Sequence, residues 1–119
     1  MDSHHPLRID YVEIAVTDVA EARKFYGETF GWECKDFGPD YIEFFDGRLR
    51  GGLTKITDDS SSPGVGPLVI LYAPDLEALA ARIEDAGGEV TREIFDFPGG
   101  RRFHFVDPSG NLLGVWSDR

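Results

Sequence analysis

Two side chains of this sequence, His104 and Glu13, have the chemistry needed to move a proton. His104 stands in a strand-like run that puts Arg102 and His104 on one face and Phe103 and Phe105 on the other. An imidazole titrates near pH ~6.5, so His104 could act as a general base, as a pH-sensitive ligand contact, or only as a hydrogen-bonded strand residue. Glu13 could pair with Arg102 or His104, act as a carboxylate base, or lie in water.

The run that carries the histidine predicts a β-hairpin over residues 101–116. Two apolar segments flank residues 107–111, Asp-Pro-Ser-Gly-Asn, in which proline presets φ, glycine allows positive φ, and the Asp and Asn side chains can bond nearby backbone. An arginine and a histidine are costly to bury against packed helices. We therefore expect the two phenylalanines to face a helix layer, and the arginine and histidine to face an opening.

Upstream, strand and helix patterns alternate along the chain. Segment 9–16 alternates apolar and polar residues as a half-buried strand does, and Asp18 then begins a run of helical apolar spacing that Gly31 ends. Short strands follow, and a polar linker, 58–66, separates them from a second strand and helix. The further predicted strands before and after the linker are 32–37, 41–45, 50–56 and 68–73.

The two halves of the chain match each other at a fixed spacing of 57 residues. The matched pairs are Asp18 and Asp75, Val19 and Leu76, Ala22 and Leu79, Tyr26 and Ile83, and Gly31 and Gly88. With a loop longer by six, Gly47, Leu49, Gly51 and Leu53 match Gly110, Leu112, Gly114 and Trp116. The repeat predicts one α+β domain over residues 1–119, with two βαβββ modules, about 8–57 and about 67–117, that form a curved mixed sheet with an open concave face.

Strand parity predicts which side chains line that concave face. They are mostly apolar and aromatic with a few polar groups, which is typical of a small-molecule pocket. The predicted lining is Tyr11, Glu13, Leu68, Ile70, Tyr72, Arg102, His104 and Trp116, with Phe44 as a further candidate. Tyr11 and Trp116 could stack on a planar ligand, and Arg102 could hold an anionic group or lie in a solvated loop. Gly51, Gly52 and Gly114 would leave room beside them.

Composition limits the partners of this chain. Its 119 residues include 12 basic and 22 acidic side chains, and the net charge of -10 repels nucleic-acid phosphates and anionic lipids. Cys34 is the only cysteine, so no disulfide can form within the chain. No signal peptide is recognisable, and no apolar run reaches the ~20 residues of a membrane span. We expect a cytoplasmic protein that binds neither nucleic acid nor membrane.

The duplicated pattern carries the motifs of a known family. They are segment 10–18, Asp-Tyr-Val-Glu-Ile-Ala-Val-Thr-Asp, the helix exit Phe25-Tyr26-x4-Phe30-Gly31-Trp32, the stop Ala86-Gly87-Gly88, and Phe105-x-Asp107-Pro108-x-Gly110-Asn111. Together they resemble the vicinal oxygen chelate superfamily, which includes glyoxalase I, bleomycin-resistance proteins, fosfomycin-resistance enzymes, methylmalonyl-CoA epimerase and extradiol dioxygenases. The resemblance covers nearly the whole chain and implies the glyoxalase/bleomycin-resistance fold, often as a homodimer.

The resemblance also implies where a divalent metal would be held. The corresponding positions are Tyr11, Gly51 or Gly52, Leu68 and Gly114. A divalent ion needs several anionic or imidazole donors, whereas tyrosine is a poor donor at neutral pH and leucine and glycine have no donor side chain. We therefore expect no metal cofactor, and we do not expect the isomerase, lyase and dioxygenase activities that depend on one.

The sequence thus favours a small-molecule-binding protein of the glyoxalase/bleomycin-resistance type that sequesters or senses a partly aromatic ligand. One alternative is an enzyme: a metal-independent acid–base catalyst using His104 and Glu13, or a glyoxalase-like lyase or isomerase with these two residues as an atypical metal ligand set. The resemblance to fosfomycin-resistance enzymes implies that His104 contacts substrate. A further alternative is an interaction module whose apolar face is a dimer interface.

Overall fold

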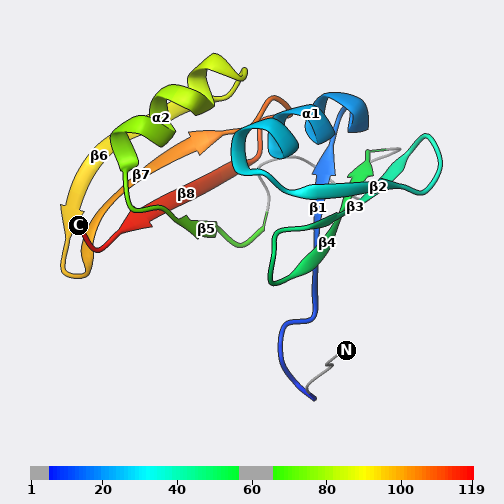
Figure 1. The fold of residues 1–119 in the computed structure, drawn as a ribbon, viewed down its shortest axis with the longest axis horizontal. Helices are drawn as coiled ribbons and strands as arrows, with labels where there is room; N and C mark the ends of the chain where they lie inside the picture. The colour runs from blue at the N-terminus through cyan, green and yellow to red at the C-terminus, as the bar shows by residue number, and fades with distance from the viewer. Residues whose placement is uncertain (1–5, 57–65) are drawn as a thin grey trace.

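A computed structural model of the chain describes residues 6–56 and 66–119, in which the order strand, helix, three strands occurs twice (Figure 1). The first module consists of β1 (Tyr11–Val16), α1 (Val19–Phe30), β2 (Glu33–Asp36), β3 (Tyr41–Phe45) and β4 (Arg50–Lys55). The second consists of β5 (Val69–Tyr72), α2 (Leu76–Asp85), β6 (Glu89–Phe97), β7 (Gly100–Val106) and β8 (Leu112–Ser117). The predicted α+β fold of two βαβββ modules is confirmed.

Both helices begin at the aspartates that the sequence predicts. The carboxylate of Asp18 accepts a hydrogen bond from the amide of Glu21 at 3.0 Å, and Asp75 accepts one from the amide of Ala78 at 3.0 Å. These caps satisfy amides that the first helical turn leaves without partners. Gly31 ends α1 with φ at 75°, a left-handed conformation that costs glycine little.

Each module forms its own four-stranded mixed sheet. The strand orders are β1-β4-β3-β2 and β5-β8-β7-β6, with a parallel pair at one edge and antiparallel pairs elsewhere. The sheets lie side by side, with both helices on the same side of the molecule (Figure 1). We call the face of each sheet that lies away from the helices its open face. The predicted hairpin is the antiparallel pair β7 and β8.

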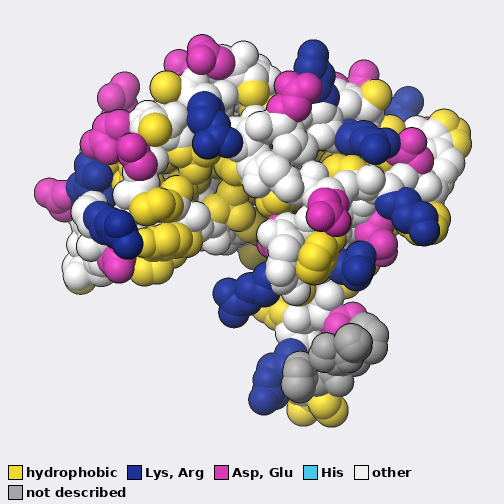
Figure 2. Space-filling model, in the orientation of Figure 1, with side chains coloured by type: hydrophobic (Ala, Val, Ile, Leu, Met, Phe, Trp, Pro, Cys, Tyr) yellow, Lys and Arg dark blue, Asp and Glu magenta, His cyan; other side chains and the backbone are white. Residues whose placement is uncertain are grey.

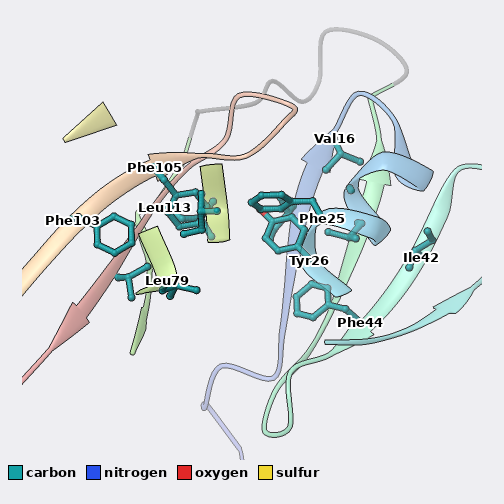
Figure 3. Packing of buried hydrophobic residues seen from close by; sticks show 14 of the residues in the cluster. Val16, Phe25, Tyr26, Ile42, Phe44, Leu79, Phe103, Phe105 and Leu113 are labelled. Carbon is teal, nitrogen blue, oxygen red and sulfur yellow. The ribbon is translucent and has the colours of Figure 1, made fainter. Parts of the chain in front are cut away.

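The hydrophobic core crosses from one module to the other. Phe103 and Phe105 of β7 are fully buried on the helix side, as strand parity predicts. Phe25 and Tyr26 of α1 project between the two sheets (Figure 3). The ring centroids of Phe25 and Phe30 lie 6.2 and 6.0 Å from that of Phe105. Side chains of α1 therefore complete the core of the second sheet as well as that of the first.

Polar contacts of the β7–β8 turn also join the modules. The buried carboxylate of Asp107 accepts a hydrogen bond from the Tyr26 hydroxyl at 2.7 Å. Burial and the neighbouring Asp107 raise the pKa of Tyr26, so its hydroxyl stays protonated and keeps donating. Ser109 Oγ accepts from the Thr17 amide at 2.9 Å, and Asn111 Nδ2 donates to a carbonyl of β1 at 2.7 Å. The turn thus fastens the second sheet to the end of β1.

The strand register corrects one detail of the predicted repeat. Gly51 of β4 lies opposite Phe44 and faces the helices, whereas Gly114 of β8 lies opposite His104 on the open face. The structural counterpart of Gly114 is therefore Gly52. The expected match between Gly51 and Gly114 is wrong by one residue, and a shift of one residue moves every side chain of a strand to the other face.

The predicted linker, 58–66, lies outside the described residues except for Gly66, so the module bounds 8–57 and 67–117 stay predictions. Within the described parts of the chain, neither helix is long and apolar enough to cross a membrane.

Candidate functional site

The open face of the first sheet carries a hydrogen-bonded group of tyrosines and carboxylates. The hydroxyl oxygens of Tyr11 and Tyr41 lie 2.6 Å apart, and Tyr41 donates to Glu13 Oε2 at 3.0 Å. Because the only hydroxyl proton of Tyr41 goes to Glu13, Tyr11 donates to Tyr41. Tyr11 also lies 3.4 Å from Glu43 Oε2. Burial and the bonds to Tyr11 and Glu13 raise the pKa of Tyr41, which therefore remains a neutral donor.

This network bears on one of the alternatives for Glu13, its pairing with Arg102 or His104. Glu13 lies on the open face of β1, as parity predicts, and its partner there is Tyr41. Among the described residues no hydrogen bond or ion pair joins it to Arg102 or His104, which lie in the second sheet. Within the described residues, Glu13 therefore does not pair with Arg102 or His104.

The space that a metal ligand would need in the first sheet is already filled. A Cβ on Gly52 would overlap the ring of Tyr41, and a Cβ on Gly51 would overlap the ring of Phe44 and the carbonyl oxygen of Val12. The expectation that these two glycines leave room is wrong, because aromatic rings of β3 lie over both of them. A ligand side chain cannot be accommodated there without displacing a ring.

The donors at the family's metal positions do not fit a divalent ion. The hydroxyl of Tyr11 is engaged with Tyr41, and Leu68 and Gly114 have no donor atom in their side chains. Nowhere in residues 6–56 and 66–119 do three His, Cys, Asp or Glu side chains gather as a metal site requires. A hard cation would find no converging ligands at this place.

The open face of the second sheet gathers most of the predicted ligand-binding residues. Ile70 and Tyr72 of β5, Trp116 of β8, and Arg102 and His104 of β7 share it through their register. Ile70 and Tyr72 are 41% and 48% exposed. The rings of Tyr72 and Trp116 meet edge to face, with centroids 5.2 Å apart. Figure 2 shows hydrophobic side chains gathered over β5 and the strands beside it, at the border of a hollow.

Phe44 does not belong to an open face. It is 3% exposed on the helix side of β3 and stacks on Trp32 with ring centroids 4.4 Å apart. Tyr41 and Glu43, two residues apart on the same strand, take the open face instead. The expectation that Phe44 joins the open face is therefore wrong. Leu68 lies just before β5 and is 37% exposed.

His104 is held in place by Arg102. Arg102 Nη2 lies 2.9 Å from His104 Nε2, and because a guanidinium only donates, Nε2 accepts and the neutral ring carries its proton on Nδ1. Burial, and then the positive charges of Arg102 and Arg92, lower the pKa of His104. The nitrogen lone pair that a general base would use is therefore already engaged.

We expect Arg102→Met to raise the pKa of His104 toward about 6.5, because the change removes a nearby positive charge. The pKa in the folded state lies below that of the unfolded chain, so the histidine's contribution to stability is present above pH ~6.5 and is lost as the pH falls through the folded-state pKa. An NMR titration of the imidazole protons measures this. Arg48→Met, the same loss of charge at an exposed turn, serves as the control. An unshifted pKa in Arg102→Met would contradict the assignment.

Sequence reasoning missed several residues of the open faces. The missed residues are Tyr41, Arg92, Phe95 and Phe97. Three of them lie on β6, where the pairing with β7 shifts register between Val90 and Arg92 and between Arg92 and Phe95. Simple alternation therefore does not mark the two faces of this strand. One signal in the repeat could have pointed to Arg92. It lies 57 residues after the basic residue Lys35, which is the spacing that relates the two modules.

Two βαβββ modules, each with a four-stranded mixed sheet and with both helices on one side, define the class of this α+β fold. The model of the Glyoxalase/Bleomycin resistance protein/Dioxygenase superfamily matches residues 8–115. The chain belongs to this superfamily, as its motifs implied.

Individual relatives agree with this assignment. The anthracycline biosynthesis protein DnrV of Streptomyces peucetius is 30% identical over an alignment 124 residues long, and this alignment covers 89% of this chain. The match covers 45% of DnrV, so the chain spans less than half the length of this curated relative. Among solved structures, a glyoxalase/bleomycin resistance protein/dioxygenase family enzyme from Burkholderia phytofirmans PsJN superposes with a TM-score of 0.81 at 16% identity, covering 93% of this chain and 100% of that one. A glyoxalase-related enzyme from Fulvimarina pelagi has a TM-score of 0.80 at 20% identity, covering 93% and 88%. These structures share the fold.

Proposed function

We propose that this chain is a small-molecule-binding protein whose ligand lies on the open face of the second sheet. The observation that carries the proposal is a group of apolar and aromatic side chains, the exposed Ile70 and Tyr72 and the half-buried Trp116, next to Arg102 and His104. Apolar walls with a few polar groups are typical of small-ligand sites, and exposed apolar surface marks a place of interaction. The name of the relative DnrV, an anthracycline biosynthesis protein, supports a role with small molecules.

We propose further that binding needs no divalent ion. The competing hypothesis is a glyoxalase-like lyase or isomerase, or a metal-free acid–base enzyme, in which Glu13 and His104 act together. Each of these side chains is held by a partner of its own, Glu13 by Tyr41 and His104 by Arg102. This separation favours binding over catalysis by that pair.

Titration with the neutral fluorescent probe N-phenyl-1-naphthylamine tests the proposal. We expect saturable binding that EDTA does not change and that Trp116→Ala weakens about tenfold, since an aromatic contact contributes about 1.4 kcal/mol. Phe37→Ala is the control, because it removes a ring that is 53% exposed in the first module. Binding that does not saturate, or an equal loss in Phe37→Ala, would contradict the proposal. A stoichiometric divalent ion in the purified protein, with binding or turnover that EDTA abolishes, would favour the lyase.

We also propose that two copies of the chain associate. Leu112, the first residue of β8, exposes 41% of its surface, and covering such a side chain with a partner is favourable. Light scattering is expected to give about twice the chain mass of 13.3 kDa. Leu112→Glu is expected to shift the mass toward one chain, because a carboxylate at this place would be buried in the interface. A single 13.3 kDa species of the unmodified chain at all concentrations would reject the dimer.

A further inference from the structure

Three nitrogen-bearing side chains surround one aromatic ring on the open face of the second sheet. The guanidinium carbons of Arg92 and Arg102 lie 3.6 and 5.8 Å from the ring centroid of Phe95, and the His104 ring centroid lies 5.7 Å from it. The register pairs Arg92 with His104 and Phe95 with Arg102, which puts all four side chains on one face. Their positive charge and donors are therefore concentrated in one small area.

Among the described residues, neither guanidinium of this group forms an ion pair. In the described parts of the chain, no carboxylate oxygen lies within the 4.0 Å of an ion pair from Arg92 or Arg102. Other arginines do have such partners, for example Arg101 with Glu77 at 2.7 Å. The chain has 22 acidic residues against 12 basic ones, and these two arginines bring their positive charges together on one face of it.

The donors of Arg102 are also incompletely used. Its Nη2 binds His104, while its Nε is buried and has no hydrogen-bond partner among the residues that the structure describes. A buried donor without an acceptor is unfavourable, and an oxygen of a bound anion would satisfy it. The fork of an arginine matches the two oxygens of a carboxylate, and such charge-assisted bonds are among the stronger ones in proteins.

The aromatic part of the face begins directly beside these donors. Arg102 lies opposite Trp116 on the neighbouring strand and 5.7 Å from the ring centroid of Phe97. The centroids of Phe97 and Trp116 are 6.4 Å apart, and Tyr72 continues the surface beyond Trp116. A single ligand could therefore place a ring on the aromatic surface and an anionic group on the arginines.

We propose that this face selects planar aromatic molecules that carry a carboxylate or a similar oxyanion, with the anion bound by Arg92 and Arg102 and the ring by Trp116 and its aromatic neighbours. The inference rests on the proposed function, which places the ligand on this face, and adds the chemical class of that ligand. It also gives Arg92, on a strand whose faces the sequence pattern does not reveal, a role in specificity.

Isothermal titration with naphthalene-2-carboxylate and naphthalene-2-carboxamide tests the proposal, because the two share a ring and differ in charge. We expect the carboxylate to bind about tenfold more tightly or better, as a charge-assisted pair of hydrogen bonds allows. Arg92→Met and Arg102→Met should each weaken the binding of the carboxylate more than that of the amide, and so reduce this preference. Arg48→Met, which removes the same charge from an exposed turn, should keep it.

The outcomes separate this inference from the proposed function. If both compounds bind equally and Trp116→Ala weakens both, the chain binds aromatic ligands but the selection for anions is wrong. If neither compound binds, this inference and the proposed function both fail. A carboxylate preference that survives in both arginine variants would also overturn the assignment. Arg92 is exposed, so Arg92→Met tests the site even if Arg102→Met proves unstable.

Discussion

Replacing Asp107 with alanine is expected to lower the free energy of unfolding by about 3–5 kcal/mol, as the loss of a buried, hydrogen-bonded charge does. Its carboxylate is 3% exposed and accepts hydrogen bonds from the amides of Ser109 and Asn111 at 2.9 and 2.8 Å and from the Tyr26 hydroxyl at 2.7 Å. Alanine would leave these donors buried without an acceptor. It would also release the turn that fastens the second sheet to β1.

The repeat supplies a matched control for this variant. Asp46 stands in the corresponding turn of the first module and accepts from the amides of Arg48 and Leu49 at 2.9 and 2.7 Å, but it is exposed to water. Asp46→Ala should therefore cost about 1 kcal/mol. Urea unfolding followed by circular dichroism measures both values. Equal losses in the two variants would show that the contact between the modules adds nothing to the turn itself.

Two glycines that look equivalent in the sequence are expected to lose very different amounts of stability on replacement with alanine. Gly51→Ala should cost about 3 kcal/mol or more, because its methyl group would overlap both a backbone oxygen of β1 and the buried ring of Phe44. Gly114→Ala should cost less than about 1 kcal/mol, because the nearest atoms to its methyl group are His104 Cδ2 at 3.2 Å and Ile70 Cγ1 at 3.5 Å, which lie on an open face.

Thermal and urea unfolding of both alanine variants check this difference. Gly52→Ala adds a third comparison, because its methyl group would meet the ring of Tyr41, a side chain that can rotate away at the surface. We expect its cost to lie between the other two. If Gly51→Ala and Gly114→Ala were equally stable, the register that places them on opposite faces would be wrong.

The parts of the fold that follow from local signals were predictable from the sequence. Helix caps depend on a few neighbouring residues, and Asp18, Asp75 and Gly31 all occupy the predicted places. The repeat then supplied the order of elements along each module, a strand, a helix and three strands. The hairpin of β7 and β8 set the parity that places Arg102 and His104 on the open face.

Features that depend on register between distant strands were not predictable. Phe44 and Phe45 are adjacent, so alternation alone does not say which ring faces the helices, and the structure buries Phe44 against Trp32. In the same way, the register shifts of β6 interrupt the alternation from which the face of Arg92 could have been predicted. The hydrogen bond from Tyr41 to Glu13 joins residues that are 28 positions apart in the sequence and lie on strands separated by β4. No local sequence pattern predicts such a contact.

The sharing of α1 between the two sheets has a consequence for how the chain gains its structure. Phe105 completes its packing only when Phe25 and Phe30 arrive from the other half, and Asp107 needs Tyr26 in the same way. Fragments 6–56 and 66–119, made separately, would each expose apolar side chains that the other half covers in the whole chain. We expect each fragment to fold only when the two are mixed. We therefore expect this protein, although it is built from duplicated parts, to fold and unfold in a single cooperative transition.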